Sequence, residues 1–570
     1  MPQHHVPGDQ AGDGAGNTRT WRAIYVGAIL LVSVPYIISF TSQLCSDDFI
    51  LLYYYGRVPL WKFRTFFDPH TIWTYHPLQD YYYAIGWHLS GIEPWAYRAM
   101  SLAFHLAIAV LLMKFGRDLT GSIHFGGWSG LLFAGQWRQW EAVAWAGSIA
   151  TVQSAFFAML ACVAFLSFLR RRSPVAYAAM LLAAVGWSFS KETIIQLPLF
   201  LAAIYSYHRW FILEHASLTP LPSGRCSLSL KRIPANQEEK QSGLRRDQSS
   251  RGGLPHPKAL PDMVRLLAAP VALVLVYLAL YGLLVQNTYT FAKPGYEPAP
   301  ASAWLSNGLR WLDIALNPLL SNDALKPPLL RKLVHWTTIR HVVPLSVALA
   351  ALFLAVVSRR MLPLFALALT FAAMIPYFAL REAYSDSRYH YGVMIAEAML
   401  VAALGREVWR LAAGKQRVWQ SGLYLSVILG GALWVIPCFL QLALCTLHDR
   451  EANRPARELY DFFASQTDKA GRPVLFVVDS RSVRQRVDVE LGWGLLECAR
   501  LAAGSDAVAA VELGYDLDRH MLDEFNGYAE KYLVRRAESV WSAERLPDSA
   551  RLALRRASDG LERVTLEKQP

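Results

Sequence analysis

The chain has 570 residues, of which 54% are hydrophobic and only 18% are charged. A soluble chain normally carries about a quarter charged residues, so the composition excludes an ordinary water-soluble enzyme, a fibre and a disordered chain. The positive mean hydropathy of +0.22 indicates a membrane protein with water-exposed parts. The net charge of +12 would suit a nucleic-acid-binding protein, but the placement of the charges argues against that class.

Apolar runs of membrane-spanning length follow a polar amino-terminal tail, residues 1–20, which we expect to be disordered and cytoplasmic. The first run, 21–43, has the ~20 residues that a spanning helix needs, and no small-residue cleavage site marks it as a signal peptide. Further spans are predicted at 95–113, 125–141, 149–169, 174–190, 193–211, 264–286, 341–357, 361–380, 390–405 and 421–445. The sequence therefore predicts a bundle of about eleven transmembrane helices.

Basic residues gather in the short loops on one side of this bundle, as the positive-inside rule requires of cytoplasmic loops. These residues are Lys114, Arg117, Arg170, Arg171, Arg172, Arg359, Arg360, Arg406, Arg410, Lys415 and Arg417. Their alternation places the amino terminus in the cytoplasm and the carboxyl-terminal tail outside. Much of the positive charge thus sets the orientation of the bundle in the membrane, and we predict no nucleic-acid partner.

A polar linker, 212–262, separates a first transmembrane module, 21–211, from a second one, 263–445. Between Arg225 and Lys258 the linker carries eight Lys and Arg against three acidic residues. We expect this linker to be disordered, cytoplasmic and able to touch anionic lipid headgroups.

Three long segments lie on the outer side: 44–94, 287–340 and the tail, 446–570. Loops of this length are usually functional or contain their own structure. In the first, 47–66 and 77–89 are predicted as interfacial helices. In the tail the pattern predicts helix at 454–466, strand at 473–479, helix at 484–503 and strand at 507–513. The predicted fold is therefore an all-α polytopic membrane bundle with a small α/β extracytoplasmic appendage.

Two adjacent carboxylates, Asp47 and Asp48, follow the first span. Carboxylates at a bilayer boundary are costly to desolvate and need a stabilising environment. In a structural interpretation, Ser46 is the N-cap of the next helix and both carboxylates face its positive end. In a functional interpretation, one of them is a general base for an acceptor hydroxyl, kept ionised by the helix and nearby cations.

The same outer loop carries His76 before a proline and tyrosine triplets at 53–55 and 81–83. Tyr and Trp rings suit a membrane interface, and they equally suit a pocket that contacts the apolar faces of a sugar. A divalent cation is an alternative ligand of this loop, although the spacing of its candidate ligands is nonspecific and we predict no firm cofactor. Those candidate ligands are Asp47, Asp48, Asp68 and His70.

Further polar side chains fall on the same outer side of the predicted bundle: Glu141, Lys191, Arg381, Arg388 and Tyr389. Neighbouring pairs such as Lys191 with Glu192 could form ordinary local ion pairs. Charges that gather at one edge of a membrane bundle usually mark a substrate path. Arg and Lys there could hold a phosphate and stabilise the charge that grows on a phosphate leaving group.

The order of these motifs over about residues 40–395 resembles the GT-C superfamily of polytopic glycosyltransferases, especially its protein O-mannosyltransferase-like branch. The matching elements are Asp47-Asp48, His76-Pro77-Leu78, the 91–97 segment with His105, the 141–145 segment, Ser190-Lys191-Glu192, and Arg388-Tyr389 with Tyr391. The chain departs from the family where His76 replaces a frequent Arg and where Arg98 replaces a common His.

The resemblance implies an enzyme that takes a sugar from a polyprenyl-phosphate carrier, with the first outer loop as the roof of the site. Asp47 or Asp48 would be the base, and in-line attack would invert the anomeric carbon. Lys191, Arg388 and Arg381 would hold the lipid phosphate, with Tyr389 beside them, while His76 and Glu141 would line the site. The lipid tail would enter between spans near the outer leaflet.

The acceptor implied is a lipid, a glycan or a protein, and we expect the protein in a bacterial inner membrane. Two other classes stay open at this point. A lipid or glycan flippase would usually show inverted repeats and broken helices at the midplane, and neither is apparent. A non-catalytic membrane scaffold would bind partners through the tail and would not need the two aspartates.

Overall fold

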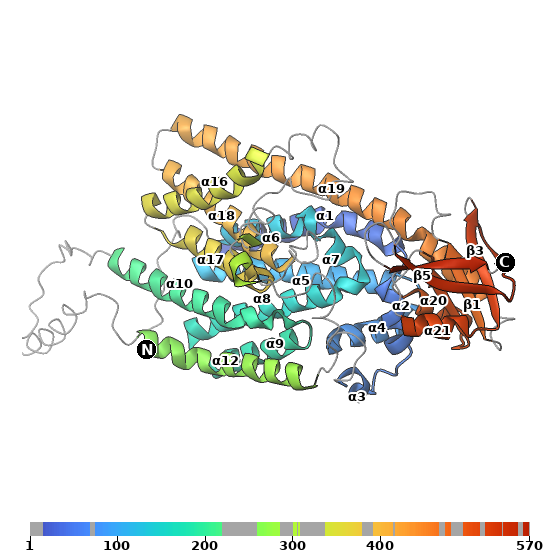
Figure 1. Cartoon of the computed structure of the whole chain (residues 1–570). Coiled ribbons are helices and arrows are strands. Elements are labelled where there is room, and N and C mark those ends of the chain that lie inside the picture. The colour runs from blue at the N-terminus through green and yellow to red at the C-terminus, as the bar shows by residue number, and fades with distance from the viewer. Residues whose placement is uncertain are drawn as a thin grey trace, which may run out of the picture.

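The computed structural model describes residues 15–68, 75–218, 259–284, 300–304, 306–307, 337–358, 360–378, 391–413, 417–466, 473–479, 494–513, 519–537, 540–556 and 562–568. These residues form a long helical bundle with a small α/β unit at one end (Figure 1). Most of the linker 212–262 and of the outer segment 287–340 lies outside the described residues.

Each of the eleven predicted spans overlaps a helix of the bundle. These helices are α1 (Ala15–Val32), α5 (Trp95–Thr120), α6 (Ile123–Ala134), α8 (Ile149–Arg171), α9 (Pro174–Ser188), α10 (Leu197–Leu218), α12 (Ala259–Leu284), α16 (Thr337–Ser358), α17 (Leu362–Phe378), α18 (Tyr391–Ala413) and α19 (Arg417–Ser465). The first span continues beyond α1 as a 3-10 helix, η1 (Val34–Thr41), which begins with Pro35 in its first turn. The third span is shorter than predicted, because α6 ends at Ala134 with Gly135 as its C-cap.

Within the described residues, four helical stretches are long and apolar enough to cross a membrane: Thr18–Thr41, Trp95–Thr120, Ala146–Arg171 and Met263–Tyr281. Shorter apolar helices occupy Pro174–Ser188, Leu345–Ser358 and Leu362–Ile375. Many of their outward side chains are large and apolar, such as Leu182 on α9 and Phe353 on α16. Such apolar outer surfaces suit a lipid environment.

Helices α5 and α6 pack with their backbones in close contact. A Cβ atom on Gly126 would lie 2.2 Å from the Met113 carbonyl oxygen, and one on Gly130 would lie 2.7 Å from the Ala109 carbonyl oxygen. Small residues at helix crossings let the two backbones approach in this way. The close approach adds van der Waals contacts, which stabilise helix pairs within lipid, where the hydrophobic effect does not drive helices together.

The first outer loop contains α2 (Asp47–Leu51), a single π-helical turn η2 (Leu52–Gly56), α3 (Phe63–Phe66) and α4 (Pro77–Ser90). The predicted helix at 77–89 is confirmed. The predicted helix at 47–66 is wrong in its continuity, because Gly56 and Pro59 interrupt it. Proline lacks the amide hydrogen that a helix interior needs and disfavours the helical conformation of the residue before it.

The tail combines a four-stranded sheet, a two-stranded hairpin and two short helices. Strands β1 (Val474–Asp479), β2 (Val508–Glu512), β3 (Glu530–Ala537) and β4 (Val540–Arg545) form the sheet in the order β2-β1-β3-β4. Strand β1 is parallel to β2 and β3, while β3 and β4 are antiparallel. Strands β5 (Ala550–Arg556) and β6 (Glu562–Lys568) form the hairpin, and the helices are α20 (Leu495–Ala503) and α21 (Arg519–Asn526).

The tail is continuous with the bundle. The predicted helix at 454–466 is the last part of α19, which runs without a break through residue 446. One hydrophobic core includes Tyr83 in the first loop, Phe463 at the end of α19 and Phe476 in β1. The tail and the helices α2 and α4 therefore lie at the same end of the molecule, whereas α10 ends and α12 begins at the opposite end (Figure 1).

Candidate active site

The two adjacent carboxylates begin in a tight turn. The Asp48 amide donates to the Cys45 carbonyl at 3.0 Å, and Ser46 adopts φ 49° and ψ −121°. These values define a type II′ turn, whose first central position normally holds glycine because φ is positive there. Ser46 stands at the N-cap position of α2 as predicted, but its side chain makes no capping hydrogen bond. The predicted capping role of Ser46 is therefore wrong.

Asp48 is completely buried and both of its carboxylate oxygens are bonded. The Tyr83 hydroxyl donates to Oδ1 at 2.5 Å, and the Cys45 amide donates to Oδ2 at 3.0 Å. Burial raises the pKa of Asp48 to about 6, although the Arg98 guanidinium and the Tyr83 hydrogen bond both lower it. Asp47 is only half-buried. The two neighbours in the sequence therefore differ in environment, and Asp47 is the one that is closer to solvent.

Arg98 links this turn to α19. Its Nη2 donates to the Gln43 carbonyl at 3.2 Å, and its charge acts on both Asp48 and Asp449. Asp449 also accepts hydrogen bonds from Ser42 and Asn453. Arg98 is 1% exposed, so this buried cation lies between the buried carboxylate of Asp48 and the half-buried one of Asp449, an arrangement that avoids the large cost of an uncompensated buried charge.

A second polar cluster surrounds the start of α4. His76 Nε2 lies 2.9 Å from Glu192 Oε2, and its Nδ1 lies 3.1 Å from Gln79 Oε1. Gln79 Nε2 in turn donates to the Gly147 carbonyl at 3.1 Å, which fixes the orientation of the amide. Both ring nitrogens of His76 thus lie within hydrogen-bonding distance of side-chain oxygens, which fixes the orientation of the ring.

Lys191 turns away from its neighbour Glu192 and into the bundle. Its Nζ donates to Thr151 Oγ1 at 2.9 Å, while Glu192 pairs with His76 instead. Lys191 and Glu192 therefore point to different sites. The Lys191 ammonium lies at the wall of a cavity, and the Glu192 carboxylate lies at the base of the first loop.

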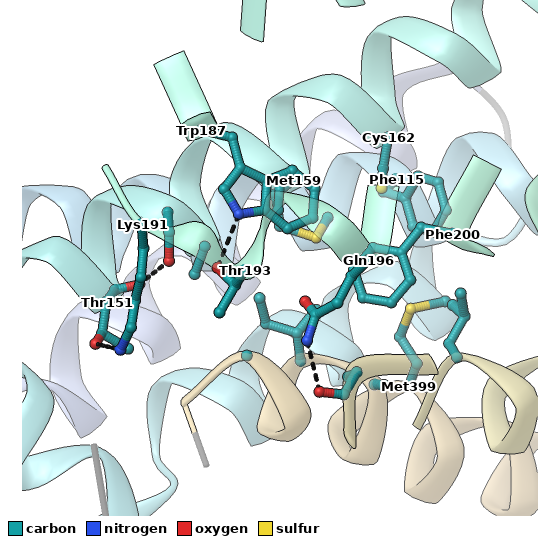
Figure 2. A pocket seen from close by; sticks show the side chains of 18 of the residues that line it. Phe115, Thr151, Met159, Cys162, Trp187, Lys191, Thr193, Gln196, Phe200 and Met399 are labelled. Atoms are coloured by element: carbon teal, nitrogen blue, oxygen red, sulfur yellow. Dashed lines mark hydrogen bonds between the residues drawn. The ribbon is translucent and has the colours of Figure 1, made fainter. Parts of the chain in front are cut away.

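That cavity lies between α8, α10, α17 and α18 and encloses about 700 Å³ of empty space, counted to include its open mouth. Lys191, Thr151 and Thr193 gather at one side of it, whereas Phe115, Cys162, Phe200 and Met399 lie at the other (Figure 2). Most of its remaining wall is also apolar. An occupant with a charged head and an apolar tail would match this distribution.

Helix α4 joins the two polar clusters. Its first turn carries Gln79 beside His76, and Tyr83, which bonds Asp48, lies one turn further along. The seven residues of α4 from 77 to 83 span about 10 Å. The structure thus brings Asp47, Asp48, His76 and Lys191 to one end of the bundle.

Of the other predicted site residues, Glu141 is among the described residues. Glu141 lies half-buried on the short helix α7 (Trp140–Ala144), which packs against α5 and α8. Arg381, Arg388 and Tyr389 lie outside the described residues, and so does His70. Within the described part of the chain, no three His, Cys, Asp or Glu side chains group as metal ligands.

Sequence reasoning missed the hydrogen bond of Tyr83 to Asp48 and the burial of Arg98. It left Tyr83 open between an interfacial belt and a sugar-contacting pocket, and it took Arg98 as a departure from a family pattern. The pairing of His105 with Tyr391 was also not predicted: His105 Nδ1 lies 2.8 Å from the Tyr391 hydroxyl inside the bundle. A buried arginine at the start of an apolar helix was the available signal, because such a charge requires partners.

Comparison with solved structures gives matches along most of the chain. ArnT from Cupriavidus metallidurans in the apo state aligns over 91% of this chain and 94% of its own, with a TM-score of 0.45 and 13% identity. ArnT bound to undecaprenyl phosphate aligns over 96% and 98%, with a TM-score of 0.41 and 14% identity. No protein-family model matches the sequence, and no curated protein sequence matches it.

A third match is the archaeal oligosaccharyltransferase AglB from Archaeoglobus fulgidus, in complex with an inhibitory peptide and a dolichol-phosphate. It aligns over 86% of this chain and 64% of its own, with a TM-score of 0.42 and 11% identity. With identities of 11–14% and TM-scores below 0.5, these matches carry no conclusion about superfamily or activity. The O-mannosyltransferase-like branch stays a prediction.

The burial of Asp48 makes a testable prediction for stability. Its pKa is about 6 in the folded protein, against the ordinary 3.8 of an aspartate. Between these pH values the folded state therefore keeps a proton that the unfolded state releases. The contribution of Asp48 to stability is therefore fully present below pH 4 and decreases by about 3 kcal/mol as pH rises past 6. Thermal unfolding in detergent from pH 4 to pH 7 should show wild type losing stability relative to Asp48→Asn. Parallel pH profiles of the two proteins would contradict this environment for Asp48.

Proposed function

We propose that the protein is an integral-membrane glycosyltransferase that moves a sugar from a polyprenyl-phosphate-linked donor to an acceptor on the outer face of the membrane. The observation that carries the proposal is the position of Lys191. This ammonium stands where a largely apolar cavity meets the polar end of the bundle, beside the loop that carries Asp47 and Asp48.

The donor lipid fits the cavity by its chemistry. The isoprenoid chain would lie against the apolar walls from α8, α17 and α18, and the phosphate would lie beside Lys191, Thr151 and Thr193. An ammonium and two hydroxyls there can stabilise the charge that develops on the phosphate as the sugar departs. Arg381, Arg388 and Tyr389 are proposed to complete the phosphate site from the outer loop between α17 and α18.

The transfer step is a single in-line displacement with inversion. The acceptor hydroxyl oxygen attacks the anomeric carbon, its proton passes to an aspartate, and the bond from the anomeric carbon to the phosphate oxygen breaks with its electron pair left on the phosphate. Asp47 is the better placed base because it is closer to solvent, whereas Asp48 is held by Tyr83 and Cys45. His76 and Glu141 would line the site.

A lipid, a glycan or a protein could each supply the acceptor hydroxyl. The proposal places the active end outside the cytoplasm, in a bacterial inner membrane with a cytoplasmic amino terminus, because the basic loops alternate in that sense.

The base assignment is tested with Asp47→Asn and Asp48→Asn in membranes supplied with a polyprenyl-phosphate sugar. We expect Asp47→Asn to lower the rate of transfer by 10²- to 10⁴-fold, as loss of a general base does, and Asp48→Asn to lower it strongly by disturbing the turn. Asp461→Asn, which changes an exposed carboxylate on α19, should transfer normally. Wild-type rates in both single variants and in the double variant would rule out the aspartates.

The phosphate assignment is tested at the cavity. Lys191→Met removes the cation from its wall and should lower kcat by about 10²-fold, because a preorganised charge at the leaving group is lost. Lys62→Met is the matched control, since Lys62 is exposed on the first outer loop. Transfer kinetics with varied donor concentration measure both variants. Equal activities of Lys191→Met and Lys62→Met would contradict a phosphate at Lys191.

A further inference from the structure

The turn that carries the two aspartates contacts the tail at Gly494. Gly494 is buried at the N-cap position of α20. A Cβ atom built on it would lie 2.2 Å from the Ser46 carbonyl oxygen and 3.0 Å from the Ser46 carbonyl carbon. Real Cβ contacts are never this short, so only glycine lets the tail approach the Ser46 backbone to this extent.

Ser46 itself is in a conformation that its residue type disfavours. It has a positive φ of 49° at the position of a type II′ turn where glycine is preferred. Non-glycine residues keep such backbone angles only where the surrounding structure imposes them, and they concentrate at functional sites. The Ser46 carbonyl also accepts a hydrogen bond from the Phe49 amide at 3.1 Å. Its orientation therefore fixes the start of α2, and with it the direction of the Asp47 and Asp48 side chains.

Additional contacts hold the tail against the same loop. The Phe49 ring stacks on Tyr460 of α19, with centroids 6.1 Å apart and an interplanar angle of 8°. The Tyr53 hydroxyl donates to Asp506, and Arg57 donates to the Leu501 carbonyl at 3.4 Å. Helix α20 thus packs against α2 and η2 along its length.

We propose that Gly494 is a positioning residue for the sugar-transfer reaction: the tail, through its close approach at Gly494, holds the Cys45–Asp48 turn in the strained form that aims the aspartates. The proposal rests on the proposed function for its catalytic consequence. The contact itself has a separate readout, because the Cys45 thiol is in the turn and is half-buried.

The experiment uses the full-length protein in membranes and compares Gly494→Ala with Gly504→Ala. Both glycines flank α20 and both have positive φ, +84° and +67°, so each substitution imposes a similar backbone strain. Nothing lies within 4 Å of a Cβ on Gly504. Gly494→Ala should lower kcat at least tenfold with little change in the donor KM, while Gly504→Ala stays within twofold of wild type.

The rate at which a maleimide reagent labels the Cys45 thiol then reports on the turn independently of catalysis. The labelled peptide is identified by mass spectrometry. Gly494→Ala should label Cys45 at least fivefold faster than wild type and Gly504→Ala. Adding Ser46→Gly to Gly494→Ala should restore part of kcat, since glycine at 46 lets the carbonyl turn aside without strain. Equal labelling in the two single variants, or no rescue by Ser46→Gly, would overturn the proposal.

The failure of this proposal is distinguishable from failure of the proposed function. If the protein transfers no sugar, faster labelling of Cys45 in Gly494→Ala still supports the positioning contact. Should Gly494→Ala not accumulate in membranes, Tyr53→Phe removes the hydrogen bond to Asp506 at the edge of the same contact, with Tyr54→Phe as control. Tyr53→Phe should raise Cys45 labelling at least threefold, and unchanged labelling would overturn the proposal.

Discussion

A buried charge must find its partners within the protein, and this constraint organises the outer end of the molecule. Asp48 is completely buried and Asp449 is half-buried, and the single guanidinium of Arg98 acts on both. These three residues come from α2, α19 and α5, so their electrostatic balance requires three distant segments to meet at one point. Removing Arg98 would leave the buried Asp48 carboxylate without this compensation, and an uncompensated buried charge typically costs several kcal/mol.

The same constraint places adjacent charged residues in different environments. Asp48 has both oxygens occupied by Tyr83 and Cys45, whereas Asp47 is closer to solvent. Likewise Lys191 lines the cavity and Glu192 bonds His76. In each doublet one residue holds the loop through hydrogen bonds, while the other lies nearer to solvent or lines the cavity. The strained turn at Ser46 and its contact with Gly494 of the tail are consistent with this difference, because both fix the direction of the Asp47 and Asp48 side chains where the chain leaves the first span.

The sequence predicted the features that depend on local pattern. Spanning helices follow from apolar runs, and strand β1 was predicted because it is buried on both faces and therefore reads as a continuous apolar segment. Strands β3 and β5 were missed because charged residues such as Lys531 and Arg551 interrupt their pattern, and one-sided strands on a small sheet give weak signals. The break in the helix at 47–66 was missed although Gly56 and Pro59 are visible in the sequence.

The candidate site was predictable only in its residue types and sidedness. No pattern distinguishes Asp47 from Asp48, since the difference arises from Tyr83, which lies 35 residues away in the sequence. The cavity was equally invisible, because it is formed by helices from both halves of the chain and lined by residues that read as ordinary span residues. Partners brought together by tertiary packing are not encoded in local spacing.

Photo-crosslinking tests most directly whether the cavity holds the donor lipid next to the carboxylate turn. A polyprenyl phosphate with a photoreactive group in its first isoprene units is bound to the protein in membranes, and the attached peptides are identified. Attachment to cavity residues such as Met159 and Met399, reduced by Lys191→Met, is the predicted result. Attachment only to outward-facing residues of α9, such as Val175 and Leu182, and unchanged by Lys191→Met, would contradict it.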